Sequence, residues 1–305
     1  MVTAAAGRRR PRGPGWRPLL LRALAAAATA VRRLTLAAGQ RVVGGREAGY
    51  RAWDPEVIGV DTAAEQAVIG VLRRARVRGL LLSEEAGEVH LGGKGREAVA
   101  AQTDVVYMVM DPFDGSMLYR RGIRALWFTA LGIYGQDGAA RAAGLVDHVT
   151  GEVVLADEAG AFCIARQGAR PVPARPSGTT AIEAAYVETY MMKPAFLYPT
   201  ASALRPLLQR ARFVLPNGGP GGFADVACGK VDVYVCWQEA LTEVFSAVAV
   251  AERAGCLVTH WDGTPLRFRP DVHALHSLVV SANARLHDEV LRALRGVTPP
   301  KGLLP

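Results

Sequence analysis

Residues 105–116 read VVYMVMDPFDGS, an apolar run of strand length that ends in two aspartates. The proline between Asp111 and Asp114 fixes the backbone φ there, so the two carboxylates can turn toward one point. Gly115 lets a ligand approach the backbone closely, and Ser116 adds a hydroxyl at an expected helix start. Backbone N–H groups at such a start favour an anion such as phosphate. Taken alone, the hexapeptide fits a plain Asp-Pro/Asp-Gly turn equally well.

A second apolar run has the same kind of ending. Residues 80–85 read LLLSEE, so that Glu84 and Glu85 also follow a short strand. Asp61 lies at the head of an expected helix, where it serves either as an N-cap or to orient a water molecule. Carboxylates gathered from separate segments suit hard cations, which favours Mg²⁺ or Mn²⁺ over zinc. The pattern therefore indicates metal-assisted phosphoryl transfer.

Positive charge is concentrated at one end of the chain. The protein has 305 residues and a formal net charge of +8. Residues 1–46 hold ten of its 36 basic residues and no acidic one. Residues 47–305 therefore hold the other 26 basic residues and all 28 acidic ones, a net charge of −2. A nearly neutral body argues against specific nucleic-acid binding, although a basic end can touch phosphates without selectivity. We expect residues 1–18 to form a disordered basic tail.

The segment after this tail has features of both a leader peptide and a packed helix. Arginines precede an apolar run, as in a signal peptide, but Arg22 interrupts the run. Apolar residues recur at helical spacing, so we expect a packed helix over Leu19–Ala38, ended by Gly39. No stretch reaches the roughly 18 uncharged apolar residues of a membrane span, and the four cysteines lack metal-binding spacing. We expect a cytoplasmic protein with reduced thiols and no membrane segment.

Turn signals divide the rest of the chain into two halves. Short strands between residues 126 and 165 predict an antiparallel meander. The proline-rich stretch 171–178 marks a boundary, so we expect a metal-site subdomain over 19–175 and a substrate subdomain over 176–305. Strands alternate with helices in the second half, as is typical of an α/β fold. The expected helices cover 61–76, 201–210, 222–229, 241–254 and 284–294. The expected strands of the second half cover 184–187, 213–215, 231–235, 256–259 and 278–281.

Four segments together resemble one known family. DPFDGS at 111–116 resembles the D-P-[ILF]-D-G-[ST] signature of the inositol monophosphatase/fructose-1,6-bisphosphatase superfamily. SEEAG at 83–87 resembles the S-E-E segment of its fructose-bisphosphatase and archaeal dual-activity members, and GVDTAAE at 59–65 resembles its D-x-x-x-E helix. AERAGCLVT at 251–259 resembles the family's step from helix to strand. The resemblance extends over about residues 19–294.

The family pattern leaves a choice for a further metal ligand. Inositol monophosphatases carry this ligand in a Trp-Asp pair, and here Trp237 is followed by Gln238, which cannot replace a carboxylate at a metal. The spacing to the 251–259 segment instead selects Glu243, as in the fructose-bisphosphatase branch. We expect Glu243 one turn inside the helix and Glu239 in the loop before it. The alternative is that Glu243 is a solvated helix residue.

The resemblance implies a layered αβαβα sandwich of the α/β (α+β) class with two subdomains. It assigns Mg²⁺, or Mn²⁺, to a set of oxygen ligands: the side chains of Glu84, Asp111, Asp114 and Glu243 and the carbonyl of Phe113. It assigns the positioning and deprotonation of the attacking water to Asp61, Glu84 and Ser116, with Glu85 as a further candidate base. It assigns phosphate binding to Asp114, Gly115 and Ser116.

The predicted function is Mg²⁺-dependent hydrolysis of a phosphomonoester on a sugar or inositol, by a cytoplasmic homodimer. Two departures from the family weaken the choice of substrate. Met117-Leu118 replaces a polar continuation of the signature, and NGGPGG at 217–222 replaces the R-x-x-G-S of the inositol branch. The alternatives are a phosphatase for 3′-phosphonucleotides and a catalytically weakened homologue that binds phosphate compounds.

Overall fold

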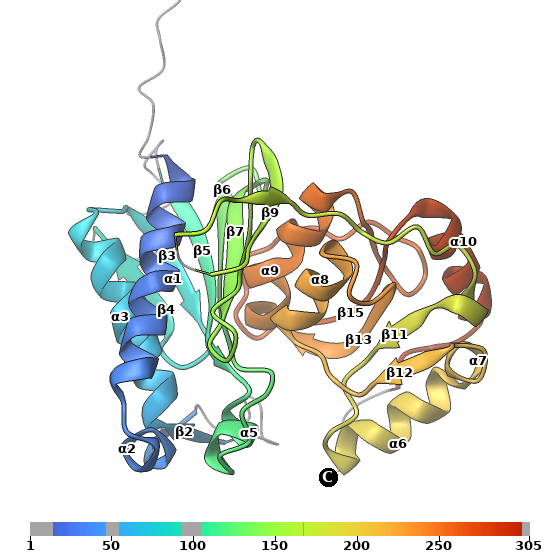
Figure 1. Cartoon of the computed structure of the whole chain (residues 1–305), viewed down its shortest axis with the longest axis horizontal. Helices are drawn as coiled ribbons and strands as arrows, with labels where there is room; N and C mark the ends of the chain where they lie inside the picture. Colours follow the sequence, from blue (N-terminus) through green and yellow to red (C-terminus); the bar gives the residue numbers. More distant parts are fainter. Residues whose placement is uncertain (1–14, 47–54, 93–104, 167, 301–305) are drawn as a thin grey trace, which may run out of the picture.

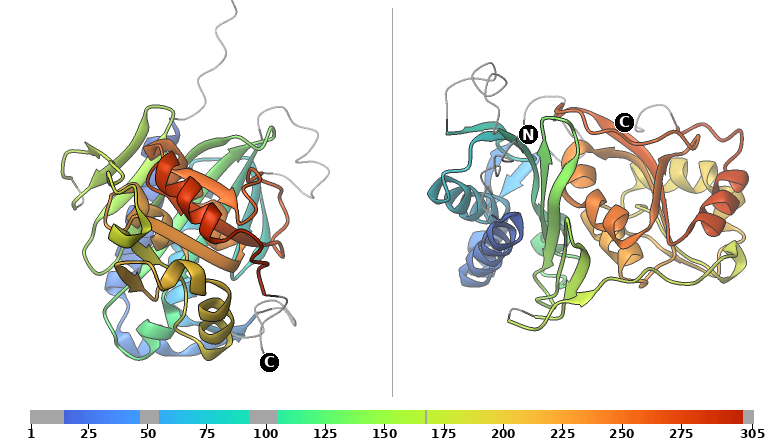
Figure 2. Two further views of the ribbon diagram at one scale, coloured as in Figure 1. Left: turned by 90° about the vertical axis from the view of Figure 1, so that its right-hand side faces the viewer. Right: turned by 90° about the horizontal axis from the view of Figure 1, so that it is seen from above.

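Five layers of secondary structure build the molecule, in the order helices, sheet, helices, sheet, helices (Figure 1). The computed structural model describes residues 15–46, 55–92, 105–166 and 168–300. Figure 2 shows α1 (Trp16–Arg33) and α3 (Gly59–Arg74) on the outer face of the large sheet. The expected αβαβα sandwich is therefore confirmed. Within the described residues, no helix is long and apolar enough to cross a bilayer.

The large sheet has eight strands in the order β10-β9-β8-β7-β6-β5-β3-β4. Its strands are β3 (Gly79–Ser83), β4 (Gly87–Leu91), β5 (Val106–Asp114), β6 (Phe128–Gly135), β7 (Ala140–Asp147), β8 (Val153–Asp157), β9 (Gly160–Ile164) and β10 (Val172–Pro173). Neighbours pair antiparallel except β3 and β5, which run parallel. Both faces of β5 are buried, since Val109 packs toward the middle layer and Met108 and Met110 toward the outer helices. This explains why its sequence is a continuous apolar run.

The second sheet has five strands in the order β12-β11-β13-β15-β14. Its strands are β11 (Tyr186–Glu188), β12 (Phe213–Leu215), β13 (Val233–Ala240), β14 (Leu257–His260) and β15 (Leu275–Ser281). β11 runs parallel to β12 and β13, whereas β15 runs antiparallel to β13 and β14. The prediction of alternating strands and helices in this half is confirmed.

The middle layer lies between the sheets and is the most buried part of the fold. It consists of α8 (Pro220–Ala227) and α9 (Leu241–Ala254), whose side chains join the core shared with β5 and β6. Because both sheets cover it, α9 is apolar almost all around rather than along one stripe. The remaining helices are α2 (Leu36–Gln40), α5 (Ser116–Arg120), α6 (Pro194–Ala203), α7 (Arg205–Leu208) and α10 (Ala284–Ala293). A two-stranded ribbon, β1 (Val42–Gly45) with β2 (Glu56–Ile58), and a short 3₁₀ turn, Ile182–Ala184, complete the described elements.

The N-terminal region differs from expectation in two ways. Helix α1 begins at Trp16, so residues 16–18 are not tail, and Arg17 forms a two-pronged ion pair with Asp157 at 2.6 and 2.8 Å. Residues 1–14 of the expected tail lie outside the described residues. The expected helix over Leu19–Ala38 is also interrupted after Arg33, and Thr35 then caps α2. Gly39 therefore lies inside α2 rather than ending a helix.

Other differences concern the ends of strands. β4 was not expected, because its half-exposed residues beside glycines resemble a loop in the sequence. β5 continues through the DPFD segment to Asp114, with an irregular register between Asp111 and Asp114. β13 extends to Ala240 rather than ending at Val235. These extensions matter because they carry acidic residues directly to the edge of each sheet.

Candidate active site

The parallel pairing of β3 with β5 brings two acidic segments together. Ser83, the last residue of β3, lies opposite Met110, so Glu84 and Asp111 follow the last paired residues at the same edge of the sheet. The backbone N–H of Glu84 donates to the carbonyl of Met110 at 3.2 Å, which continues the pairing one residue further. The side chain of Glu84 therefore lies beside that of Asp111, and both residues are buried.

Helix α9 contributes a third carboxylate from the other half of the chain. Glu243 lies in its first turn, where its Oε2 accepts a hydrogen bond from the N–H of Ala240 at 3.1 Å. Carboxylate oxygens of Glu84, Asp111 and Glu243 all lie within 4.8 Å of one another. Such a set of negative oxygens is costly without a cation, and oxygen ligands fit Mg²⁺ or Mn²⁺. The residues present therefore suit a hard divalent ion.

The turn after Asp111 has a conformation that the sequence allowed. Gly115 has φ +96°, and a Cβ there would run into the carbonyl oxygen of Leu126. Ser116 starts α5, and its Oγ lies 2.6 Å from Oδ1 of Asp61 and 2.9 Å from the carbonyl oxygen of Phe113. Asp61 and Ser116, 55 positions apart, thus meet at the edge of the carboxylate cluster.

Helix α3 supplies two buried acids one turn apart. Asp61 accepts a hydrogen bond from the N–H of Ile58 at 2.8 Å in addition to its contact with Ser116. Burial raises the pKa of Asp61 to about 7. Glu65 accepts from the hydroxyl of Ser83 at 2.6 Å and from the N–H of Ala86 at 2.9 Å. It therefore holds the turn that carries Glu84 in place.

Arg46 was not singled out in the sequence, where it counted only as one of many arginines. Its Nη2 lies 3.0 Å from Oε1 of Glu84 and 2.6 Å from Oε1 of Glu85, and all three side chains are buried. Burial, together with the neighbouring charge of Glu84, raises the pKa of Glu85. Glu85 is thus turned toward Arg46, and its assignment as a further base stays a prediction.

Asp114 takes a different position from the other acidic ligands expected. It lines the same cavity as Glu84, Ser116 and Glu243 but is not one of the three residues that converge. Its carboxylate lies against Gly219, at the loop before α8, where an added Cβ would come within 2.8 Å of Oδ2. The structure therefore places Asp114 between the cluster and the second half of the chain.

The far wall of the cavity contains a buried acid that the sequence reading misplaced. Glu239 was expected in a loop before the helix, but it lies in β13 and is only 7 % exposed. Its Oε1 accepts from the hydroxyl of Tyr234 at 2.9 Å, and Gly219 N lies 3.4 Å away. Burial raises the pKa of Glu239 well above its ordinary value, and the neighbouring Glu243 adds to this. The expectation of a loop at Glu239 is wrong because β13 is longer than its apolar run suggested.

A comparison with sequence models of protein families identifies the relatives of this chain. The model of the inositol monophosphatase family matches residues 16–298. This chain belongs to the inositol monophosphatase family. Membership of the inositol monophosphatase family makes the protein a metal-dependent phosphomonoester hydrolase. No curated protein sequence matches the chain significantly.

Several solved structures, two of them described as inositol monophosphatases, share the fold at low sequence identity. An inositol monophosphatase from Anabaena sp. PCC 7120 is 22% identical, with a TM-score of 0.69 over 93% of this chain and 96% of that one. The extragenic suppressor protein suhB from Bartonella henselae is 19% identical, with a TM-score of 0.73 over 92% and 98%. The MJ0109 gene product, described as an inositol monophosphatase–fructose 1,6-bisphosphatase, is 17% identical, with a TM-score of 0.70 over 92% and 99%.

Proposed function

We propose that the protein hydrolyses a phosphate monoester of a sugar or inositol, of the kind represented by fructose 1,6-bisphosphate and inositol 1-phosphate, with Mg²⁺ or Mn²⁺ as cofactor. The observation that carries the proposal is the convergence of Glu84, Asp111 and Glu243 within 4.8 Å beside the Asp61–Ser116 pair. Three elements from distant parts of the chain supply these carboxylates, which no single turn motif explains.

Glu84, Asp111 and Glu243 would hold the metal, with Asp114 and the carbonyl of Phe113 as further ligands at the same edge. The cation would supply the positive charge that binds phosphate oxygens and stabilises the leaving oxygen. The chain itself supplies the geometry, because the β3–β5 pairing and the first turn of α9 fix the carboxylates before any ligand arrives.

Ser116 and Asp61 would move the proton of the attacking water. With the Ser116 hydroxyl donating to Asp61 Oδ1 at 2.6 Å, the lone pairs of Oγ can accept a hydrogen bond from water in the cavity. As the water attacks phosphorus, its proton can pass to Ser116 while the serine proton passes to Asp61. Phosphate would lie against Gly115 and Ser116, which both line the cavity.

The second half of the chain would contact the part of the substrate beyond its phosphate group. Its contributions to the cavity include one cation, two amides and two aromatic side chains, from Lys193, Asn217, Gln238, Tyr190 and Phe196. These groups suit a hydroxylated, negatively charged ester. Action in the cytoplasm as a homodimer remains a prediction.

The experiment is a phosphate-release panel with Mg²⁺ and Mn²⁺ at pH 7.5. Sugar phosphates, inositol phosphates and 3′-phosphonucleotides are compared at equal concentration, and metal-free protein is the blank. Glu84→Gln and Asp111→Asn should each remove most of the activity while the protein stays folded by circular dichroism. Glu158→Gln is the matched control, because Glu158 is exposed and should leave kcat unchanged.

Three results would contradict the proposal. Preference for a 3′-phosphonucleotide would move the substrate to the alternative class. Binding of phosphate esters without release of phosphate would make the protein a binder. Near-normal kcat in Glu84→Gln at saturating Mg²⁺ would remove Glu84 from the metal site.

A further inference from the structure

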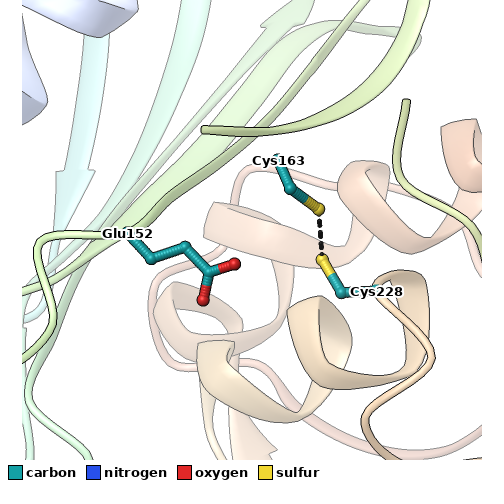
Figure 3. A group of neighbouring side chains, drawn as sticks. All are labelled: Glu152, Cys163 and Cys228. Atoms are coloured by element: carbon teal, nitrogen blue, oxygen red, sulfur yellow. Dashed lines mark hydrogen bonds between the residues drawn. The ribbon is translucent and has the colours of Figure 1, made fainter. Parts of the chain in front are cut away.

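Two cysteines that are far apart in the sequence meet between the large sheet and the middle layer. Cys163 lies on β9 and Cys228 directly follows the last residue of α8, 65 positions later. Their sulfur atoms point toward each other (Figure 3). The two atoms lie 2.7 Å apart. Both residues are half-buried rather than enclosed in the core. The sequence suggested no such pair, because no short spacing connects the two.

The surroundings make the two sulfur atoms unlike each other. The hydrogen bond from Cys228 lowers the pKa of the Cys163 thiol, and Lys230 acts in the same direction. The same hydrogen bond, together with burial, raises the pKa of Cys228. Cys228 is the more deeply buried of the two, which disfavours its thiolate, so Cys163 is the sulfur that attacks first.

We propose that Cys163 and Cys228 are a modification site, at which a reversible disulfide joins β9 to the end of α8. The oxidant is a small disulfide, RSSR, such as oxidised glutathione. The Cys163 thiolate attacks one sulfur of RSSR, releases RS⁻ and forms a mixed disulfide. Cys228 then loses its proton, and its thiolate attacks the sulfur of Cys163 and expels the second RS⁻. The two protein thiols are oxidised by two electrons, and RSSR is reduced to two RSH.

A bound metal ion is the competing use of this cluster, because a carboxylate oxygen of Glu152 also lies within 4.8 Å of both sulfur atoms. Two observations favour the disulfide. Oε2 of Glu152 already accepts a hydrogen bond from Nζ of Lys230 at 2.6 Å, within an ion pair. Two thiolates on one zinc ion, each about 2.3 Å from it, would be roughly 3.8 Å apart. The two sulfur atoms lie 2.7 Å apart, closer than two thiolates that share one zinc ion.

The bond would connect the large sheet to the middle layer. Helix α8 begins at Pro220, immediately after Gly219, whose Cα lies against the carboxylate of Asp114. Its other end carries Cys228. A disulfide to β9 would therefore anchor the far end of the helix whose near end borders the candidate active site. It would also close a loop that contains the boundary between the two halves, which restricts the unfolded chain.

The test uses the full-length protein, first reduced and then equilibrated with a glutathione redox series. Thiols are counted in denaturant, the intact mass is measured, and the linked peptides are mapped. We expect the count to fall from four to two, the mass to fall by about 2 Da, and one peptide to join Cys163 to Cys228. The melting temperature should rise by roughly 5 °C on oxidation, given the loop length and the size of the protein.

Variants separate the pair from the other thiols. Cys163→Ser and Cys228→Ser should each abolish the cross-link and the rise in melting temperature, whereas Cys256→Ala should keep both. Four free thiols in the wild-type protein under strongly oxidising glutathione would overturn the proposal, and so would a cross-link that uses other cysteines or joins two chains. Stoichiometric zinc that protects both thiols in the reduced protein would assign the cluster to a metal instead. Because the peptide map reads only the cysteines, its failure says nothing about the phosphatase activity.

Discussion

Replacing Glu243 by glutamine removes one negative charge from the carboxylate cluster while it keeps the length of the side chain. The amide oxygen can still accept the hydrogen bond that the N–H of Ala240 now gives to Oε2 at 3.1 Å, so the start of α9 should be preserved. The change therefore tests the charge of Glu243 rather than the fold. Its expected effect is on the binding of the metal ion.

The size of the effect follows from the geometry. Carboxylate oxygens of the cluster lie within 4.8 Å of one another, so an ion among them would be no more than about 4 Å from the charge of Glu243. Even with the dielectric constant of water, a unit pair at that distance gives about 1 kcal/mol, and a divalent ion gives about 2 kcal/mol. This corresponds to a roughly 30-fold weaker affinity. The estimate is a lower limit, because Glu243 is partly buried.

The assay is a calorimetric titration of metal-free protein with Mn²⁺, repeated for Mg²⁺ by the concentration that gives half-maximal phosphatase activity. Glu252→Gln is the matched control, since it makes the same change near the other end of α9 at an exposed position. We expect the control to keep the wild-type affinity and Glu243→Gln to lose at least about 30-fold.

Glu239→Gln provides the sharpest contrast. Glu239 is buried, with its Oε1 accepting from the hydroxyl of Tyr234, and burial raises its pKa well above the ordinary value. A neutral glutamine resembles the protonated acid, so this variant should change metal affinity little. If Glu239→Gln weakened the metal and Glu243→Gln did not, the register of the α9 ligand would be wrong.

Three further perturbations test other parts of the site. Mg²⁺ at millimolar concentration should raise the melting temperature by mass action, and Asp111→Asn should remove that rise in a thermal scan. Gly115→Ala should lower the free energy of unfolding, measured in urea, by about 2 kcal/mol, because φ is +96° and the added Cβ would meet the carbonyl of Leu126. Gly87→Ala is the control: its φ is +64° and the space around it is open, so it should cost less. Burial lowers the pKa of His148 to about 4. Between pH 6.5 and 4 the unfolded chain therefore binds more protons at this residue than the folded protein does. As the pH is lowered over that range, the free energy of unfolding should fall by roughly 3 kcal/mol. His148→Gln should lose that part of the pH dependence. If the wild-type protein and the variant had identical pH profiles, the pH dependence would not come from His148.

Local patterns were sufficient for the elements nearest the chemistry. The apolar runs before Glu84 and Asp111 predicted β3 and β5, because strands buried on both faces need apolar residues at every position. The spacing from the 251–259 segment predicted Glu243 on a helix, and α9 has the expected bounds. A glycine at position 115 permits the left-handed turn that the structure shows, since few other residues adopt such a backbone without strain.

Contacts between distant residues could not be read in this way. Arg46 reaches Glu84 and Glu85 only because the β1–β2 ribbon carries it there, and its sequence neighbours give no sign of an ion pair. Cys163 and Cys228 meet only because α8 ends beside β9. Such pairings depend on how whole elements pack, and a single sequence records the type of each element but not which elements become neighbours.

The positions at which strands and helices end depend partly on the local sequence and partly on tertiary packing. Residues 105–116 by themselves determine an apolar strand, a carboxylate pair and a glycine turn, because each follows from backbone preference and hydrophobic burial. Only the tertiary structure decided that β13 would continue to Ala240 and hold Glu239 inside the protein, since its pairing with β15 resumes beyond Cys236 and overrides the local polar sequence. Side-chain chemistry is local, whereas burial and proximity belong to the packed molecule.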